Sequence, residues 1–403
     1  MMNEKCRQLG DELAELKGLR DDFVREFELG KASGDLSGQE LMDLKDVINA
    51  LLKGDTELAR FREAVLPPQL KLKEQYESQV RVAWNSGLFE ESLPGQVEAG
   101  KTSLPFIERK GQKYPMPTWK EVQKILHKPE NREIIKEKSA QGFTQMLIVP
   151  FGYDLKTMAQ KFKAKMRELD QSGLNVDGSS NPMKGIFGAG GEKVEFKRDD
   201  DNYPVDIWDG WTEDQMVYYP KKYDKKEHGG QTKEDVIKIN GAWQICFVED
   251  MEKMALIPLN GEILVESAGQ NLGRKQIDRK GSFIKKEFKD RQNEPRIYEY
   301  KAAMDVKQKL VNPKAYQHEK GFIPEKYLWM QLTFLLAKEK PVLMDYENNN
   351  WRGTYLMECY NFVSGLVTFA HWYDFPSQLR FGGKNPSHRD DHYGVRSLVD
   401  IKK

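Results

Sequence analysis

The sequence is poor in cysteine, lacks a long apolar run and carries no net charge. Its three cysteines, Cys6, Cys246 and Cys359, are odd in number and widely spaced, which excludes a disulfide framework and a Cys-x-x-Cys metal or redox motif. No segment approaches the length of an apolar helix that spans a bilayer, and the first residues lack the apolar core of a signal peptide. We therefore expect a cytoplasmic protein without a membrane span.

The charge balance also limits the class of partner. The chain has 63 basic and 63 acidic residues, so no overall field favours nucleic acid or an anionic membrane. The glycine-rich segment 185–191 has neither the dinucleotide-binding spacing nor the phosphate-loop spacing, and we expect it to be a loop. We predict no cofactor. The length of 403 residues is typical of two or three domains.

Residues 1–91 have the periodicity of amphipathic helices. Leucine and phenylalanine recur every three or four residues among charges from Leu9 to Phe27, and Ser37 with Glu40 forms a capping box before a second apolar stripe. The heptads are too interrupted for a long coiled coil, so the pattern predicts a helical hairpin or a short coiled coil that forms a homo-oligomer. A helical domain that packs only on itself remains an equal alternative.

Residues 104–171 predict a small α/β region. Lys110-Gly111 marks a hairpin, and Thr118 with Glu121 forms a capping box in front of a helix. The apolar run 144–149 is typical of a buried strand, and Asp154 is placed to cap the helix that follows it. The next segment, 172–203, has little apolar periodicity and predicts an irregular connection.

Residues 205–403 predict a C-terminal domain that combines short aromatic strands with one apolar helix, so the whole chain is of the α+β class. The helix opens at Pro324 and Glu325 and is apolar over most of its surface, as expected for a buried helix. We predict strands within 205–211, 216–220, 241–248, 351–359, 365–372 and 397–401.

The segment from His371 to Tyr393 differs in composition from the rest of the chain. It contains three of the six histidines, one lysine and no glutamate, and is otherwise rich in Tyr, Phe, Asp, Asn, Ser and Gly. Binding loops use these residues, because Tyr and Phe bring contact area at low entropic cost while Ser, Gly and Asn adapt their hydrogen bonds. On composition alone, a binding surface and an ordinary polar loop at the end of a globular domain are equal alternatives.

The residues that interrupt this composition carry a family resemblance. Trp372, Gln378, Phe381, Pro386 and Arg389 are followed by Gly394-Val395-Arg396 and a short terminal strand. This pattern resembles the variable proteins of diversity-generating retroelements, with a weaker likeness over 142–150 and 243–250. The resemblance implies a C-terminal C-type lectin fold of the formylglycine-generating-enzyme type, in which codons copied from template adenines become random. Lys384 departs from the permitted codons.

The resemblance implies a variable, ligand-binding region at about 370–394 that binds a protein or another macromolecule. Scaffold positions that hold its shape are Trp372, Gln378, Phe381, Pro386, Arg389, Gly394 and Arg396. Positions expected to contact the ligand are His371, Tyr373, Asp374, Phe375, Ser377, Arg380, Asn385, Ser387, His388, Asp390, Asp391, His392 and Tyr393.

Two other functions remain open. The chain could be a structural protein that assembles through its helical N-terminus, or an oxidase or metalloenzyme. The related oxidase binds copper through a pair of cysteines, whereas Cys359 stands alone here. His371, His388 and His392 with Asp390 and Asp391 are possible metal ligands, although a random draw from the same residues produces such clusters. No triad order, nucleophile elbow or sugar-binding calcium signature occurs, so we predict a non-enzymatic protein without a metal site.

Overall fold

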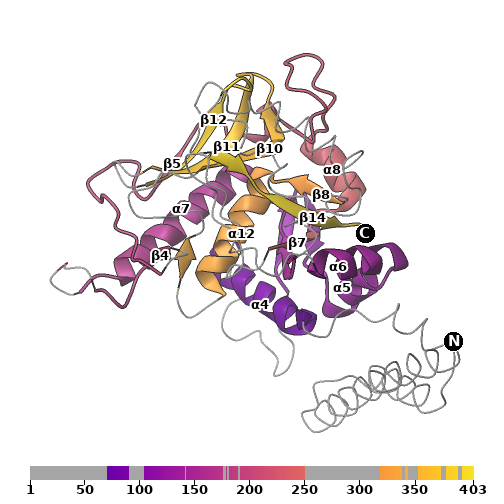
Figure 1. Cartoon of the computed structure of the whole chain (residues 1–403), viewed down its shortest axis with the longest axis horizontal. Coiled ribbons are helices and arrows are strands. Elements are labelled where there is room, and N and C mark those ends of the chain that lie inside the picture. The colour runs from indigo at the N-terminus through magenta and orange to yellow at the C-terminus, as the bar shows by residue number, and fades with distance from the viewer. Residues whose placement is uncertain are drawn as a thin grey trace, which may run out of the picture. The chain divides into compact units, whose positions relative to one another are not determined.

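The computed structural model describes part of the chain, and the element labels of Figure 1 are used from here on. The described ranges are 70–89, 104–140, 142–175, 178, 181–188, 191–249, 318–337, 341–343, 353–373, 378–388 and 393–403. The predicted N-terminal hairpin or coiled coil, up to residue 69, lies outside them. The described residues have a mixed α+β architecture, as the sequence predicts.

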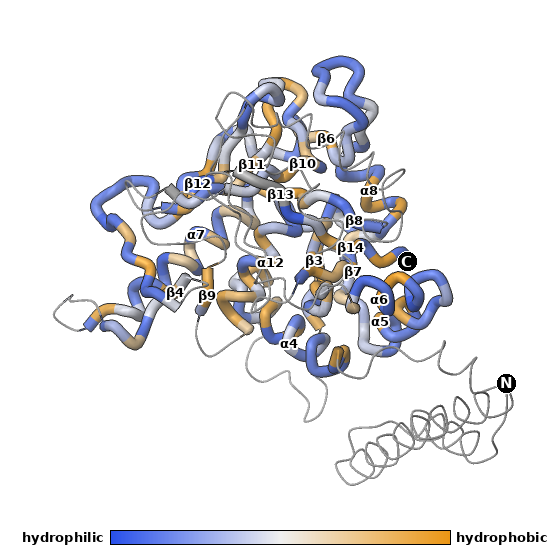
Figure 2. The backbone as a smooth tube through the Cα atoms, in the orientation of Figure 1, coloured by the Kyte–Doolittle hydropathy of each residue, from blue (hydrophilic) through white to orange (hydrophobic). Residues whose placement is uncertain are grey.

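A four-stranded antiparallel sheet joins distant parts of the sequence. Its order is β3 (Gln145–Val149), β7 (Gln244–Val248), β14 (Ser397–Ile401) and β8 (Glu319–Gly321). All five residues of β7 and four of β3 are buried, and both strands are coloured as hydrophobic in Figure 2. Because β3 pairs with β7 and β7 with β14, the ranges 104–171 and 205–403 are not separate domains. They belong to one compact unit, Pro67–Lys403.

The helix α4 (Leu72–Asn85) belongs to this unit rather than to the predicted helical domain 1–91. The side-chain oxygens of Gln75 and Gln79 accept hydrogen bonds from the backbone N–H groups of Met146 and Ile148, at 2.5 and 3.0 Å. These bonds satisfy the free edge of β3. An amphipathic period identifies such a helix but does not show which sheet it covers.

A second sheet has six strands in the order β13-β10-β11-β12-β5, with β6 also paired to β10 (Figure 1). It contains β5 (Val205–Ile207), β6 (Met216–Tyr218), β10 (Gly353–Asn361), β11 (Leu366–Tyr373), β12 (Gln378–Lys384) and β13 (Tyr393–Val395). The pairs β10–β13 and β12–β5 are parallel and the others antiparallel. The strand β12 lies within the segment 371–393, where we predicted no strand beyond residue 372.

Two small sheets complete the strands. The hairpin of β1 (Phe106–Arg109) and β2 (Gln112–Pro115) turns at Lys110-Gly111, as predicted, with positive φ at both residues. β4 (Phe187–Gly188) pairs in parallel with β9 (Val342–Leu343). The expectation that 185–191 is entirely loop is therefore wrong at Phe187, whose buried side chain and strand pairing fix it.

Local capping signals identify several helices. Thr118 forms the predicted capping box of α5 (Trp119–Leu126), and Asp154 caps α7 (Leu155–Ser172) by accepting from Thr157 N–H at 2.7 Å. A third box, Thr232 with Asp235, opens α8 (Lys233–Asn240) and was not recognised in the sequence. The remaining short elements are α6 (Pro129–Ala140) and the 3-10 helix η2 (Glu213–Gln215).

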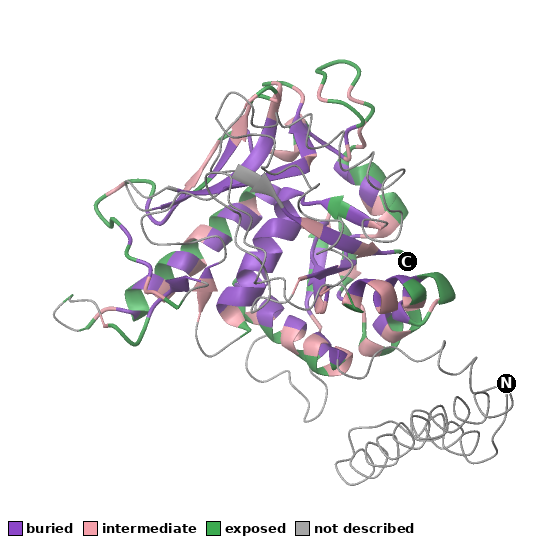
Figure 3. Cartoon of the chain, in the orientation of Figure 1, coloured by how far each residue is buried: buried purple, intermediate pink, exposed green. Residues whose placement is uncertain are grey.

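The helix α12 (Pro324–Leu336) forms the centre of the fold. Every residue from Pro324 to Leu335 is buried, as Figure 3 shows, and the helix contacts α4, α7, β3 and β10. Its two buried charges are compensated: Glu325 accepts from Tyr218 Oη at 2.6 Å, and Lys326 Nζ lies 2.5 Å from Asp400 Oδ1. A helix surrounded on all sides shows no apolar stripe, which agrees with its sequence.

Removal of one partner from a buried ion pair should strongly destabilise the fold. Lys138 Nζ of α6 lies 3.1 Å from Glu319 Oε1 of β8, and the two side chains are 1% and 0% exposed. We expect Lys138→Met to lower the free energy of unfolding by about 3–5 kcal/mol, because it leaves a buried carboxylate uncompensated. Denaturant titration measures the change.

The control is Lys165→Met, which removes the partner of a largely exposed carboxylate, Glu168. It should change the unfolding free energy by under about 1 kcal/mol. Similar losses for both variants would contradict the assignment.

Candidate functional site

The six-stranded sheet brings part of the predicted ligand-binding set to one end. Tyr373 pairs with Gln378 and His371 with Arg380 across β11 and β12, while Gly353 at the start of β10 pairs with both His371 and Tyr393. Four predicted contact positions separated by up to 22 residues in sequence therefore lie at the same end of the sheet, with β10 between Tyr393 and His371. We call His371, Tyr373, Arg380 and Tyr393 the β11–β12 end.

Another part of the set lies at the opposite end of β12. Lys384 pairs with Val367, next to the turn that joins β10 to β11, and Asn385, Ser387 and His388 follow directly. The seven residues of β12 separate the two ends by about 20 Å, from the rise per residue of a strand. The described residues thus form two groups rather than one continuous surface. The remaining predicted positions lie outside the described ranges: Asp374, Phe375, Ser377, Arg389, Asp390, Asp391 and His392.

Exposure differs among the contact positions. The Arg380 side chain is 53% exposed and its Nε lies 3.1 Å from Asp206 Oδ2 on β5, while Asn385 and Ser387 are exposed and His388 is half-buried. His371, expected as a polar contact, is 5% exposed, with its ring 6.4 Å from that of Phe369. It therefore contributes little surface, because its strand position places it inside the sheet packing.

The predicted scaffold residues Trp372 and Phe381 lie in the core. Phe381 stacks on Trp211 with ring centroids 4.7 Å apart and touches Phe162 of α7 at 5.5 Å. Trp372 meets Phe196 edge to face, also at 5.5 Å. Other members of the set are placed as follows: Gln378 and Arg396 are buried, Pro386 is half-buried, and Gly394 pairs with Thr354 in the parallel pair β10–β13.

A polar cluster supports the start of β12. Asp170, 1% exposed at the end of α7, binds Arg198 through both oxygens at 2.7 Å and accepts from Tyr203 Oη at 2.6 Å. Burial, reinforced by Asp170, raises the pKa of the Tyr203 phenol. The next residue, Pro204, accepts a hydrogen bond from Leu379 N–H at 3.1 Å. The segment 172–203 was expected to be an irregular connection, and no local pattern indicated that it supports the site.

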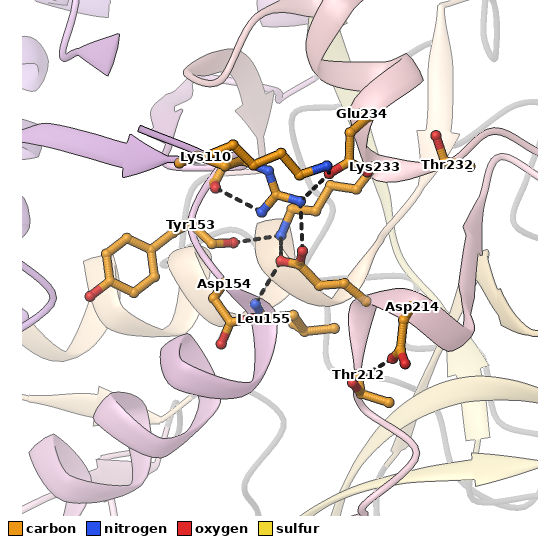
Figure 4. A network of polar contacts seen from close by, with 12 residues as sticks. Lys110, Tyr153, Asp154, Leu155, Thr212, Asp214, Thr232, Lys233 and Glu234 are labelled. Atoms are coloured by element: carbon orange, nitrogen blue, oxygen red, sulfur yellow. Dashed lines mark hydrogen bonds and ion pairs between the residues drawn. The ribbon is translucent and has the colours of Figure 1, made fainter. Parts of the chain in front are cut away.

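A second polar network lies between β1, η2, α7 and α8 (Figure 4). Glu213 accepts from Leu155 N–H at 3.0 Å, from Arg109 Nη2 at 2.8 Å and from Lys233 Nζ. Lys233 is 1% exposed and also lies 3.1 Å from Glu325 Oε1 of α12. These contacts join β1, η2, α7, α8 and α12.

The two described cysteines are buried in different sheets, Cys246 in β7 and Cys359 in β10. Burial raises the pKa of the Cys246 thiol to about 12 and raises that of Cys359 well above its ordinary value. Both are therefore protonated and unreactive near neutral pH. Cys359 Sγ lies 3.5 Å from Met216 Sδ. Within the ranges given above, no group of three His, Cys, Asp or Glu side chains is arranged to hold a metal ion, and every helix is too short or too polar to cross a bilayer.

Gly382 of β12 should not tolerate a side chain. A Cβ on Gly382 would lie 2.5 Å from Cε1 of Phe369, a distance at which the ring must move. We expect Gly382→Ala to lower the free energy of unfolding by about 1–3 kcal/mol through overpacking. Ser387→Ala, at an exposed position, should change it by under about 0.5 kcal/mol. Equal stability of the two variants in thermal and denaturant unfolding would show that Gly382 is not constrained.

Acid should weaken the network of Figure 4 at Glu234. Hydrogen bonds from Lys110 and Arg109 lower the pKa of this carboxyl to about 2. A lowered pKa stabilises the fold above the ordinary value of about 4.5, and the contribution is lost as pH falls towards 2. Wild type should therefore exceed Glu234→Gln in unfolding free energy at pH 6, by under about 1 kcal/mol because the side chain is partly exposed.

The gap between wild type and Glu234→Gln should narrow between pH 4.5 and pH 3. Denaturant titrations at several pH values measure it, with Glu77→Gln at an exposed position of α4 as the control. A gap that stays constant with pH would contradict the prediction.

Comparison with known proteins finds no relative of this chain. No family model matches the chain, and neither a curated protein nor a solved structure matches it. The family resemblance of the C-terminal segment therefore stays a prediction.

Proposed function

We propose that the chain is a ligand-binding display protein whose C-terminal surface is diversified to bind varied targets, mainly proteins. The observation that carries the proposal is the placement of Tyr373, Arg380 and Tyr393 on different strands at the same end of one sheet. Binding residues in proteins are commonly presented at the ends of rigid elements, where substitutions leave the core unchanged.

The alternation along β12 supports this use. Leu379 and Phe381 are buried, Phe381 against Phe162 of α7 and Trp211, whereas Arg380 between them is exposed. A substitution at Arg380 therefore changes the surface without changing the packing below it. Binding and stability thus depend on different residues of the same strand, as a diversified surface requires.

The C-type lectin fold of the C-terminal domain and the diversification of its surface are part of the same proposal. The segment Gly394-Val395-Arg396, which carries the family resemblance, spans the end of β13 and leads directly into β14. In the proposed C-type lectin fold this segment closes the domain. Apart from the scaffold positions and Lys384, the residues of 371–393 are ones that adenine-directed copying of a template can produce.

The decisive test is the DNA that flanks the gene. We expect a non-coding near-copy of the codons for about residues 365–401, with a reverse transcriptase gene nearby. Mismatches between the two copies should fall at template adenines and at the predicted contact positions. A complete flank without such a copy would overturn diversification.

The β11–β12 end should also bind measurably through Tyr373. A phage-displayed peptide library panned on the wild-type chain provides the probe peptides. We expect Tyr373→Ala to weaken the enriched peptides that bind this end at least about tenfold, because aromatic residues carry most of the energy of such surfaces. The matched control is Phe106→Ala, at a 45% exposed aromatic on β1. Affinities within twofold of wild type for every enriched peptide would count against the proposed surface.

A further inference from the structure

A row of three polar residues crosses the six-stranded sheet at the β11–β12 end. His371 of β11 pairs with Arg380 of β12, and Arg380 pairs in turn with Asp206 of β5. Because directly paired residues point to the same face of a sheet, all three side chains share one face. His371 is buried, whereas the Arg380 side chain is 53% exposed and the Asp206 side chain is 22% exposed. Asp206 is the member of this row that lies outside the predicted variable region.

Backbone hydrogen bonds join β5 to β12 on both sides of Asp206. Leu379 N–H donates to the Pro204 carbonyl at 3.1 Å. Trp208 N–H donates to the Phe381 carbonyl at 2.8 Å. The aspartate is therefore held at a fixed register against β12, and little backbone entropy remains to be lost there when a ligand binds.

Arg380 uses only part of its guanidinium group for the ion pair with Asp206. Its Nε lies 3.1 Å from Asp206 Oδ2, and its two terminal nitrogens make no hydrogen bond or ion pair within the described part of the chain. Arg198, by contrast, donates from Nε and Nη2 to both oxygens of Asp170. Arg380 therefore keeps two donors, in one plane, for a second acceptor.

Further charges surround Asp206 at this edge of the sheet. The helix α7 packs beside β5 and carries five basic and two acidic residues. Its half-buried Lys163 interacts with Asp206: burial and the nearby Arg167 lower the pKa of Lys163, while Asp206 and Asp200 oppose the shift. With Arg380, these interacting groups bring three positive charges to two carboxylates. The excess of positive charge favours an acidic ligand.

We propose that Arg380 binds a carboxylate of a protein ligand and that Asp206 is the positioning residue that orients the guanidinium group for it. The inference rests on the proposed function, since it names the ligand chemistry of one contact at the β11–β12 end. A carboxylate matches the two terminal nitrogens of an arginine in a planar, bidentate contact. A phosphate or a nucleic acid fits less well, because its additional negative charge is repelled by Asp206 beside the site.

Two effects of Asp206 on such a ligand have opposite signs. As a competing anion, it would weaken the attraction between Arg380 and the ligand carboxylate, and its removal would strengthen binding. As a positioning residue, it reduces the side-chain freedom that Arg380 loses on binding, and its removal weakens binding. The contact through Nε supports the second effect, because it leaves the two nitrogens that the ligand needs unoccupied.

The probes for the test are synthetic copies of the phage-selected peptides that Tyr373→Ala weakens. Each peptide is paired with an amide version, in which Asn and Gln replace Asp and Glu. For at least one pair, the acidic version should bind wild type at least about tenfold more tightly, as expected for a charge-assisted bidentate contact. On Arg380→Gln the difference should fall below about threefold. The control Arg81→Gln, at an exposed arginine of α4, should retain the full difference.

Substitutions of Asp206 test the positioning role. Asp206→Ala should weaken the acidic peptide at least about threefold, and Asp206→Asn should weaken it less, because the amide oxygen can still accept from Nε. Both should leave the amide version within about twofold of wild type. A purely structural role of Asp206 would weaken the two versions equally, and a competing role would make both variants bind the acidic peptide more tightly. Either result would overturn the positioning role.

The carboxylate contact is judged on the wild-type chain alone, so this test stands even if Asp206→Ala does not fold. Acidic and amide versions that bind wild type equally in every pair would overturn it, while the loss with Tyr373→Ala would leave the β11–β12 end as a binding surface. A selection that enriches no peptide would overturn the surface and this inference with it. The flanking DNA judges diversification independently of these measurements.

Discussion

The complete burial of α12 is the constraint on which the described fold depends. Its first turn brings two opposite charges, Glu325 and Lys326, into the interior, where each needs a partner. Burial opposes the charge of Lys326, but Asp400 outweighs it and the pKa of Lys326 is raised. Glu325 accepts a hydrogen bond from Tyr218 of β6 and pairs with Lys233 of α8. Lys326 pairs with Asp400 of β14. The same helix turn therefore ties the two larger sheets together.

This arrangement explains why the C-terminal segment can be both core and surface. The aromatic side chain of Phe381 packs against Trp211, Phe162 of α7 and Tyr327 of α12, which fixes β12 on its inner side. Arg380 leaves the same strand towards solvent. The inner aromatic contacts hold β12 in place, and the outer Arg380 side chain adds an ion pair with Asp206 of β5 at the surface.

Local signals in the sequence predicted part of this structure, and non-local contacts account for the rest. The capping residues Thr118 and Asp154 act within one helical turn, so the sequence alone identifies them. The strand β12 could not be recognised, because its glycines and polar residues are typical of loops and only pairing with β11 and β5 makes it a strand. The ion pair of Lys138 with Glu319 joins residues 181 positions apart, beyond any periodicity.

The same distinction decides which part of the candidate site was predictable. Composition and the family resemblance predict a binding surface over 370–394 and treat this segment as uniform. The structure divides it, because Gly382 is covered by Phe369 and Gly383 by Trp208. A side chain at either glycine would displace a ring, so variants at these codons would be lost through instability rather than through failure to bind. The proposed variation is therefore excluded at these two glycines, and a ligand that engages both groups has to span about 20 Å.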